Sequence, residues 1–249
     1  MHILVSNDDG YSSEGIAALA NAMSDFGRVS VFAPEVDKSG SSNSLTLDRP
    51  LVVKKAKTGF FYINGTPTDC VHIAATSILE NPPDFVVSGI NCGRNVAEDV
   101  HYSGTVAAAM EGFMLNIPSV AFSLDSGNFK NLSTATEVSK ILISNLISNP
   151  FSASYLLNVN IPDVPLKDFM GLTVCKPGHR LGAQKAVKSK SPRGDDLYWV
   201  GPVGNPVNHD EIGTDFCALR NKQASITPLK TNLCDEKVMN KVKNWLEKF

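Results

Sequence analysis

One stretch near the N-terminus limits what this chain can fold into more than any other. Ile3-Leu4-Val5 is a short apolar run with two β-branched residues, which is typical of a buried strand. Ser6-Asn7-Asp8-Asp9-Gly10 ends that strand in turn-forming residues, and apolar residues then recur at helical spacing from Ile16 to Phe26. The pattern predicts a strand-turn-helix unit with two adjacent carboxylates at the carboxyl end of its strand.

The two carboxylates, Asp8 and Asp9, have two interpretations. Ligands bind at this edge of open parallel sheets, and a hard divalent cation relieves the repulsion between neighbouring carboxylates. The simpler interpretation is a polar turn that ends a strand and caps the next helix. The pair alone leaves both open.

Strands and helices alternate from this unit to about residue 161, which predicts an α/β fold with a Rossmann-like, doubly wound, mainly parallel sheet. The glycine fingerprint of dinucleotide-binding folds and the Walker loop are both missing, so NAD binding and ATP hydrolysis lose support. We expect further strands at 29–33, 84–87, 117–122 and 155–160, an edge pair at 51–53 and 60–63, and helices that start at Thr66 and Ser103 and span about 133–145.

The pattern changes after Pro165. Short strand candidates separated by Gly, Pro and Asn predict β-hairpin extensions, which commonly pair with another chain. We therefore predict a catalytic core over 1–164 and a hairpin-rich oligomerisation region over 165–249, with a homodimer and a homotetramer both open. The candidates are 172–174, 185–187, 197–200 and 224–227, followed by a last helix over about 234–247 with Val238, Val242 and Trp245 on one face.

Composition narrows the class of partner. A formal net charge of −2 offers no electrostatic reason to expect duplex nucleic acid or an anionic membrane surface. No apolar run is long enough for a membrane-spanning helix, and the chain begins directly with a strand instead of a signal sequence. The five cysteines form no CxxC pair, which argues against a zinc site or a disulfide framework and fits a reduced cytoplasm.

Two further polar stretches lie near the predicted edge. A helix that starts at Ser103-Gly104-Thr105 offers free N–H groups to an anion, although ordinary capping by Ser103 explains the same residues. The loop 35–44, rich in Ser and Gly, follows the second strand and is either solvated or reaches the two carboxylates.

Taken together, the motifs resemble the SurE family, the stationary-phase survival proteins that act as nucleotidases. The resemblance covers nearly the whole chain, with the motifs in the same order. They are Ser-Asn-Asp-Asp-Gly at 6–10, Ser-Gly-Ser-Ser-Asn-Ser-Leu-Thr at 39–46, Gly-Thr-Pro-Thr-Asp-Cys at 65–70, Val-Ser-Gly-Ile-Asn-Cys-Gly at 87–93, Tyr-Ser-Gly-Thr-Val-Ala-Ala-Ala-Met-Glu-Gly at 102–112, Gly-Thr-Asp-Phe at 213–216 and Ser-Ile-Thr-Pro-Leu at 225–229.

This resemblance implies a metal-dependent phosphatase, a 5′-nucleotidase that hydrolyses nucleoside 5′- and 3′-monophosphates and also short-chain polyphosphate. It implies one divalent cation per subunit, and oxygen ligands suit Mg²⁺ or Mn²⁺. Matched by position, the cation ligands are Asp8, Asp9, Ser39 and Asn91, phosphate binds at Asn95, Ser103, Gly104 and Thr105, and the catalytic residues are Asp8, Asp9, Asn95 and Ser103.

The sequence leaves several alternatives open. The nucleophile is either a metal-activated water or Asp8 itself, through a phosphoaspartate. The chain could instead be a regulatory module that binds nucleotide or metal without turnover. A third possibility, an α/β hydrolase with a serine nucleophile, is disfavoured because the sequence has no Gly-x-Ser-x-Gly elbow. Arg94 and Ala97 stand where the family usually has Pro and Gly, and we expect Arg94 to add a donor near the phosphate. Base preference and preferred metal also stay open.

Overall fold

A nine-stranded sheet forms the centre of the molecule. The computed structural model describes all residues, 1–249. The strands are β1 (His2–Ser6), β2 (Arg28–Pro34), β3 (Val53–Lys55), β4 (Phe61–Ile63), β5 (Phe85–Cys92), β6 (Ser119–Asp125), β7 (Leu156–Pro162), β8 (Leu172–Val174), β9 (His179–Arg180), β10 (Val187–Lys190), β11 (Asp196–Trp199), β12 (Pro206–Val207) and β13 (Ala224–Pro228). The helices are α1 (Glu14–Met23), α2 (Pro67–Ile73), α3 (Gly104–Met114), α4 (Leu132–Ser148), α5 (Asp215–Arg220) and α6 (Glu236–Leu246).

The strand order is β3-β4-β2-β1-β5-β6-β7-β13-β8, and the pairs from β4 through β7 are all parallel. The chain builds outward from β1 on one side, then returns to β5 and builds outward on the other. This reversal lies between β1 and β5, where doubly wound sheets bind their ligands. The predicted α/β, Rossmann-like, doubly wound fold is confirmed.

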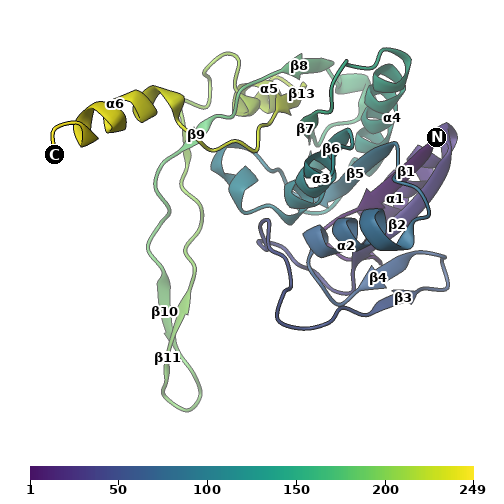
Figure 1. The fold of residues 1–249 in the computed structure, drawn as a ribbon, viewed down its shortest axis with the longest axis horizontal. Helices are drawn as coiled ribbons and strands as arrows, with labels where there is room; N and C mark the ends of the chain where they lie inside the picture. The colour runs from purple at the N-terminus through teal and green to yellow at the C-terminus, as the bar shows by residue number, and fades with distance from the viewer.

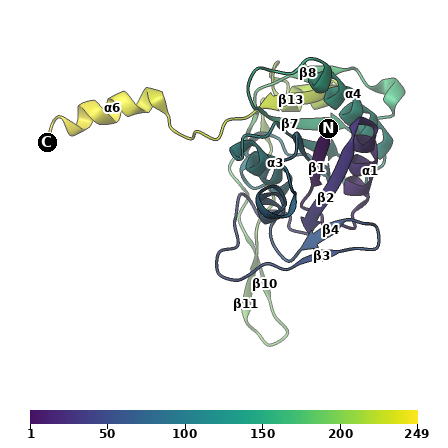
Figure 2. The same cartoon turned by 45° about the vertical axis from the view of Figure 1, so that its right-hand side comes forward.

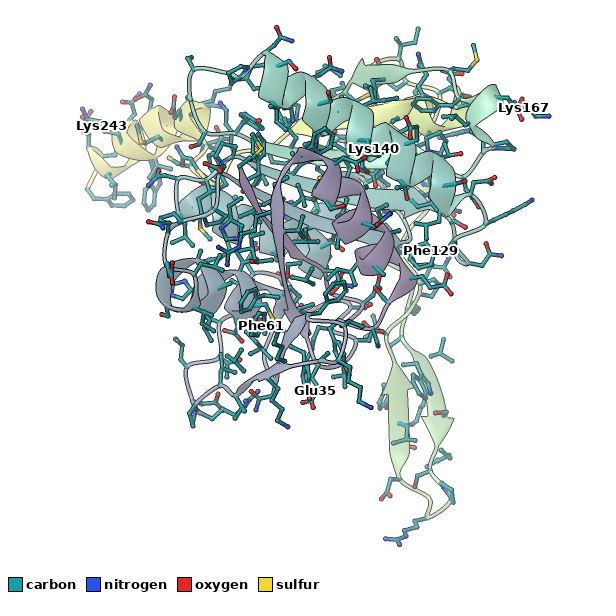
Figure 3. All side chains as sticks on the ribbon, turned by 90° about the vertical axis from the view of Figure 1, so that its right-hand side faces the viewer. Glu35, Phe61, Phe129, Lys140, Lys167 and Lys243 are labelled. Carbon is teal, nitrogen blue, oxygen red and sulfur yellow. The ribbon has the colours of Figure 1, made fainter.

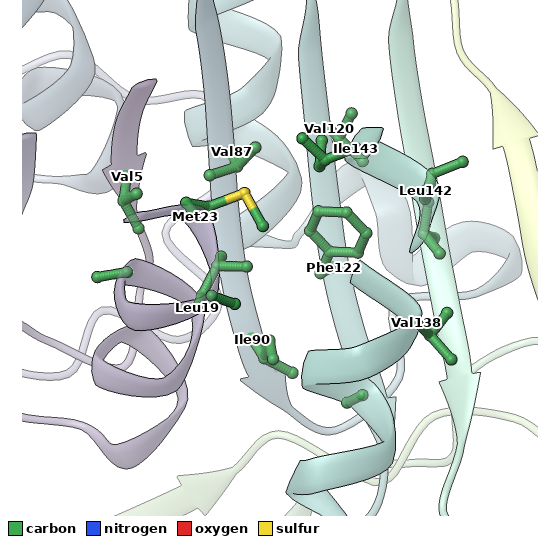
Figure 4. Packing of buried hydrophobic residues seen from close by; sticks show 14 of the residues in the cluster. Val5, Leu19, Met23, Val87, Ile90, Val120, Phe122, Val138, Leu142 and Ile143 are labelled. Carbon is green, nitrogen blue, oxygen red and sulfur yellow. The ribbon is translucent and has the colours of Figure 1, made fainter. Parts of the chain in front are cut away.

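Helices cover both faces of the sheet (Figure 1). On one face, α1 and α4 pack over β5 and β6, where Leu19 and Met23 meet Phe122 in the largest apolar cluster (Figure 4). The same two helices lie side by side when the molecule is turned (Figure 3). On the other face, α2 and α3 pack together over smaller clusters. The central parallel strands β1, β5, β6 and β7 are therefore buried along most of their length, as their largely apolar sequences require.

Local chemistry explains the helices that approach the candidate site. In α1, a Cβ on Gly15 would lie 2.0 Å from the Ile90 carbonyl, so only glycine lets this helix pack so closely on β5. At the start of α2, the Thr66 hydroxyl accepts from the Asp69 N–H while the Asp69 carboxylate accepts from the Thr66 N–H. This reciprocal cap confirms the helix start expected at Thr66.

Two features of the sheet differ from the sequence prediction. The strand expected over 84–87 continues to Cys92, through a register shift between Ser88 and Asn91, because its polar residues still pair with β6. The strands near 172–174 and 224–227 were expected to project as hairpins, but β8 and β13 join the central sheet beside β7. Ala224 of β13 is fully buried there, a cover that an isolated hairpin lacks.

The hairpin β10–β11 and helix α6 do project from the body (Figures 1 and 2). No residue of α6 is buried, and Val238, Val242 and Trp245 stay exposed along it. The division into a core over 1–164 and an oligomerisation region over 165–249 remains a prediction. No helix has the length and apolar character to span a membrane.

Candidate active site

The turn after β1 holds the two carboxylates at the reversal point of the sheet. Asn7 shapes this turn, because its side-chain amide donates to the Gly10 carbonyl at 3.0 Å and to the Ser13 hydroxyl at 2.9 Å. Asp8 is only 4% exposed and Asp9 is partly buried. The side-chain oxygen of Asn7 is buried without a hydrogen-bond partner.

Both carboxylates are destabilised in their charged form. Burial raises the pKa of Asp8, and the hydrogen bond donated by the Thr105 hydroxyl only partly opposes it. Burial, followed by the neighbouring charge of Asp8, raises the pKa of Asp9 to about 6. No lysine or arginine contributes to either shift. Two adjacent, partly or fully buried carboxylates with no cationic side chain beside them form a suitable site for a bound cation.

The loop 35–44, which carries Ser39, reaches the turn after β1, which was one of its two interpretations from the sequence. The Lys38 N–H donates to the backbone carbonyl of Asp8 at 2.8 Å, so the neighbouring Ser39 lies next to the carboxylate turn. The hydroxyl of Ser39 itself donates to Asp37 at 2.7 Å. Ser41 has a buried hydroxyl without a partner.

Asp69 fixes the far end of the Ser39 loop. Its carboxylate accepts from the Thr46 N–H at 2.9 Å and from the Thr46 hydroxyl at 2.6 Å. The cap at the start of α2 therefore also ties down a loop of the site. Sequence reasoning missed this contact, although Asp69 lies in the Gly-Thr-Pro-Thr-Asp-Cys motif.

Asn91 lies beside the carboxylates at the end of β5. Its amide donates to the Gly93 carbonyl at 2.8 Å, which leaves the side-chain oxygen free to accept or to coordinate. The N–H of the next residue, Cys92, donates to the Asp9 carboxylate at 3.4 Å. The parallel pairing of β1 with β5 therefore brings Asp9, which follows β1, next to Asn91 near the end of β5.

The start of α3 packs directly against Asp8. A Cβ on Gly104 would lie 2.7 Å from the Asp8 Cβ and 2.9 Å from the Ser41 hydroxyl, so this contact needs glycine. The Ser103 hydroxyl accepts from the Val106 N–H at 3.1 Å as the N-cap, and the Thr105 hydroxyl donates to Asp8. Because both hydroxyls are engaged, the first-turn N–H groups of α3 are its main donors to an anion.

Asn95 lies in the loop between β5 and α3. Its side-chain amide donates to the Ser123 hydroxyl of β6 at 2.8 Å, which leaves one N–H of that amide for a ligand. The backbone of Asn95 is bonded to Asn158 and Asn160 of β7. Neither asparagine was identified from the sequence, where both look like ordinary strand residues.

The Arg94 side chain is engaged with other protein groups, and the expectation that it adds a donor near the phosphate stays a prediction. Its guanidinium pairs with Asp125 at 3.5 Å and lies over the ring of Phe216, 5.6 Å from the ring centre. Both partners come from elements beyond the loop, β6 and α5. The arginine therefore fastens the loop where the family's usual proline would stiffen it.

The side chains at this edge fit a hard cation. No group of three His, Cys, Asp or Glu residues gathers anywhere in the chain, so a zinc-type site is not formed. The edge instead offers two carboxylates, an amide oxygen and hydroxyls, beside buried unpartnered oxygens of Asn7 and Ser41. Such oxygen-rich sets suit Mg²⁺ or Mn²⁺.

Comparisons with known proteins show which proteins this chain is similar to. The family described as Survival protein SurE matches residues 3–184. A 5′-nucleotidase SurE of Nitrosomonas eutropha is 51% identical over 246 residues, covering 99% of both chains. A 5′-nucleotidase SurE of Chromobacterium violaceum is 49% identical over 248 residues, covering 100% of both. The crystal structure of the SurE protein from Aquifex aeolicus superposes with a TM-score of 0.86 at 40% identity, covering 99% of this chain and 100% of that one.

Proposed function

Because this chain belongs to the SurE family, we propose that it is a 5′-nucleotidase, which hydrolyses nucleoside 5′-monophosphates to nucleoside and phosphate. Relatives that match over their full length at about 50% sequence identity are named 5′-nucleotidase SurE. The observation that carries the proposal onto this chain is the meeting of two carboxylates, Asp8 and Asp9, with a helix N-terminus at one sheet edge. Hydrolysis of nucleoside 3′-monophosphates and of short polyphosphate is a further proposal from the family resemblance.

We also propose that activity depends on one divalent cation per subunit, held by Asp8, Asp9, Ser39 and Asn91. When bound, the cation would supply Lewis acidity to the phosphoryl group and its attacking water. The support is the charge arrangement, since the raised pKa values of the two carboxylates fall back when a cation shares their position. The Thr105 hydroxyl, bonded to Asp8, keeps that carboxylate in place.

The remaining residues would orient the phosphoryl group. The first-turn N–H groups at Gly104 and Thr105 would hold its oxygens, and Ser103 would keep that turn in shape as N-cap. The free N–H of the Asn95 amide would add a further donor. Donors placed in advance around the reacting phosphorus stabilise charge on its equatorial oxygens as the bond to the leaving oxygen breaks.

Self-association and a cytoplasmic location complete the proposal. The apolar side of α6, with Val238, Val242 and Trp245, is exposed, and so are Tyr198 and Trp199 of the projecting hairpin. Such surfaces suit a second copy of the chain, in a homodimer or a homotetramer. All five cysteines are free thiols, as in proteins of a reducing cytoplasm.

Phosphate release from nucleoside 5′-monophosphates tests the function. Wild-type protein with Mn²⁺ or Mg²⁺ should release phosphate, and Asp8→Asn should reduce kcat by orders of magnitude. A matched control is Asp84→Asn, which removes the same charge just before β5, at the amino ends of the central strands, where the Asp84 carboxylate accepts from the His2 N–H. The proposal fails if wild type releases no phosphate, or if the Asp8 and Asp84 variants have equal activity.

A further inference from the structure

The loop that carries Asn95 is held by buried polar groups of β7. The Asn95 N–H donates to the Asn160 side-chain oxygen at 2.7 Å. The Asn95 carbonyl accepts from the amides of Asn158 at 2.8 Å and Asn160 at 3.0 Å. Both strand asparagines are buried, so the sheet fixes the backbone of Asn95 in both directions.

A second support comes from the part of the chain after residue 165. Asp215 begins α5 and is 1% exposed. One carboxylate oxygen accepts from the Ala97 N–H at 2.8 Å. The other accepts from the Gly178 N–H at 2.9 Å and from the Phe216 N–H at 2.8 Å. A buried carboxylate with three charge-assisted hydrogen bonds to backbone holds its partners firmly.

The backbone at Ala97 needs such support. Its φ is 51°, in the left-handed region that residues with a Cβ avoid. Only Val96 separates it from Asn95, so a loop that relaxed at Ala97 would also move the Asn95 amide. Asp215 therefore accepts a hydrogen bond from the residue of this loop with the least favourable backbone conformation, Ala97.

Arg180 contacts the residues that follow Ala97 in the same loop, Glu98 and Asp99. Its guanidinium, 9% exposed, donates to the two oxygens of Asp99 at 3.0 and 2.5 Å and lies over the Phe216 ring. The Arg180 N–H donates to Glu98 at 2.9 Å. The segment from Asn95 to the N-cap Ser103 is therefore bonded to the C-terminal region at two successive places.

From these contacts we infer that Asp215 is a positioning residue for the reaction, with Arg180 in a supporting role. Asp215 holds the Asn95 amide where the phosphoryl group is bound, although it belongs to the region that sequence reasoning set apart from the catalytic core. The inference rests on the proposed function for its effect on turnover. Its structural part, that Asp215 orders the loop, is independent of that function.

The test replaces Asp215 by Asn, which has the same shape but offers only one acceptor oxygen. Asp215→Asn should lower kcat for nucleoside 5′-monophosphates roughly 100-fold, as a displacement of about 1 Å does, with a smaller change in KM. The Mn²⁺ concentration that half-saturates the protein should stay within about twofold, since the carboxylates after β1 are untouched. Hydrogen exchange should speed up in the peptide 93–101 and not in β1 or β5.

Thr214→Ala is the matched control. It removes the hydroxyl that caps the same helix by accepting from the Cys217 N–H at 3.3 Å, and it leaves all acceptors of Asp215 in place. It should lower the melting temperature, while kcat and the exchange of 93–101 stay near wild type. If Asp215→Asn does not fold, Arg180→Lys, which loses the two-point contact with Asp99, provides the same measurements.

The inference is overturned if Asp215→Asn, or Arg180→Lys in its place, leaves kcat and loop exchange near wild type. It is also overturned if Thr214→Ala loses as much kcat at an equal loss of melting temperature. Failure of the proposed function looks different. In that case wild-type protein releases no phosphate, while the exchange comparison still shows whether Asp215 orders the loop.

Discussion

Replacing Asp9 by Asn should make the metal-free protein more stable. The pKa of Asp9 in the folded chain is about 6, against an ordinary value of 3.8, because of burial and the charge of Asp8. A difference of about two in pKa corresponds to roughly 3 kcal/mol at 1.36 kcal/mol each. Because Asp9 is partly exposed, solvent screening reduces this to about 1.5 kcal/mol.

The pH dependence follows from the direction of this shift. Between about pH 4 and pH 6 the folded state binds more protons at Asp9 than the unfolded state does, so stability falls as pH rises. Above pH 6 the full penalty is present, and below pH 4 it is absent. Asp9→Asn should therefore melt about 3–6 °C higher than wild type at pH 8 in chelator, and the gap should close near pH 4.

Added metal should reverse the order of stability. Mn²⁺ at 100 times its Kd would add about 2.7 kcal/mol to wild type and much less to a variant that has lost an anionic ligand. Melting curves at pH 8 with chelator and with Mn²⁺, for wild type, Asp9→Asn and the control Asp84→Asn, measure this crossing. The reasoning is refuted if Asp9→Asn is no more stable than wild type in chelator, or gains as much from Mn²⁺.

Three other changes test separate parts of the structure. Gly104→Ala should cut phosphatase activity at least about tenfold despite the better helix propensity of alanine, because its Cβ would meet Asp8 and Ser41; unchanged kcat would contradict this contact. Arg94→Ala should lower kcat more than it raises KM, since it frees the loop that carries Asn95 from Asp125 and Phe216, and steady-state kinetics will separate the two. Light scattering at micromolar concentration should give a mass of at least two chains, and Trp245→Ser should lower it; a monomeric wild type would contradict self-association through α6.

The sequence predicted most of the core because local and long-range signals agree there. The Thr66 cap and the Ser103 N-cap appear as expected, and so does the turn after β1. Each of these elements is specified by residues close together in the chain, and alternation of buried strands with amphipathic helices determines the layers. The two carboxylates could therefore be located at the carboxyl end of β1 without coordinates.

What the sequence could not predict depends on contacts between distant segments. β13 returns to pair with β7, and no local pattern distinguishes it from a projecting hairpin. The contact of Asp215 with Ala97 joins residues 118 positions apart, and the side chain of Arg94 turns toward Phe216. Such pairs are chosen by burial and by unsatisfied N–H groups that exist only once the fold has formed.

The most direct test of the account measures phosphate release from a nucleoside 5′-monophosphate while Mn²⁺ is titrated into chelator-treated protein. Wild-type activity should be lost in chelator and should return as about one Mn²⁺ binds per chain, with binding followed by calorimetry on the same sample. Asp8→Asn and Asp9→Asn should bind Mn²⁺ weakly and stay nearly inactive through the same titration. Full activity in chelator, or an Asp9→Asn protein that binds Mn²⁺ and turns over like wild type, would contradict a metal-dependent nucleotidase centred on these two carboxylates.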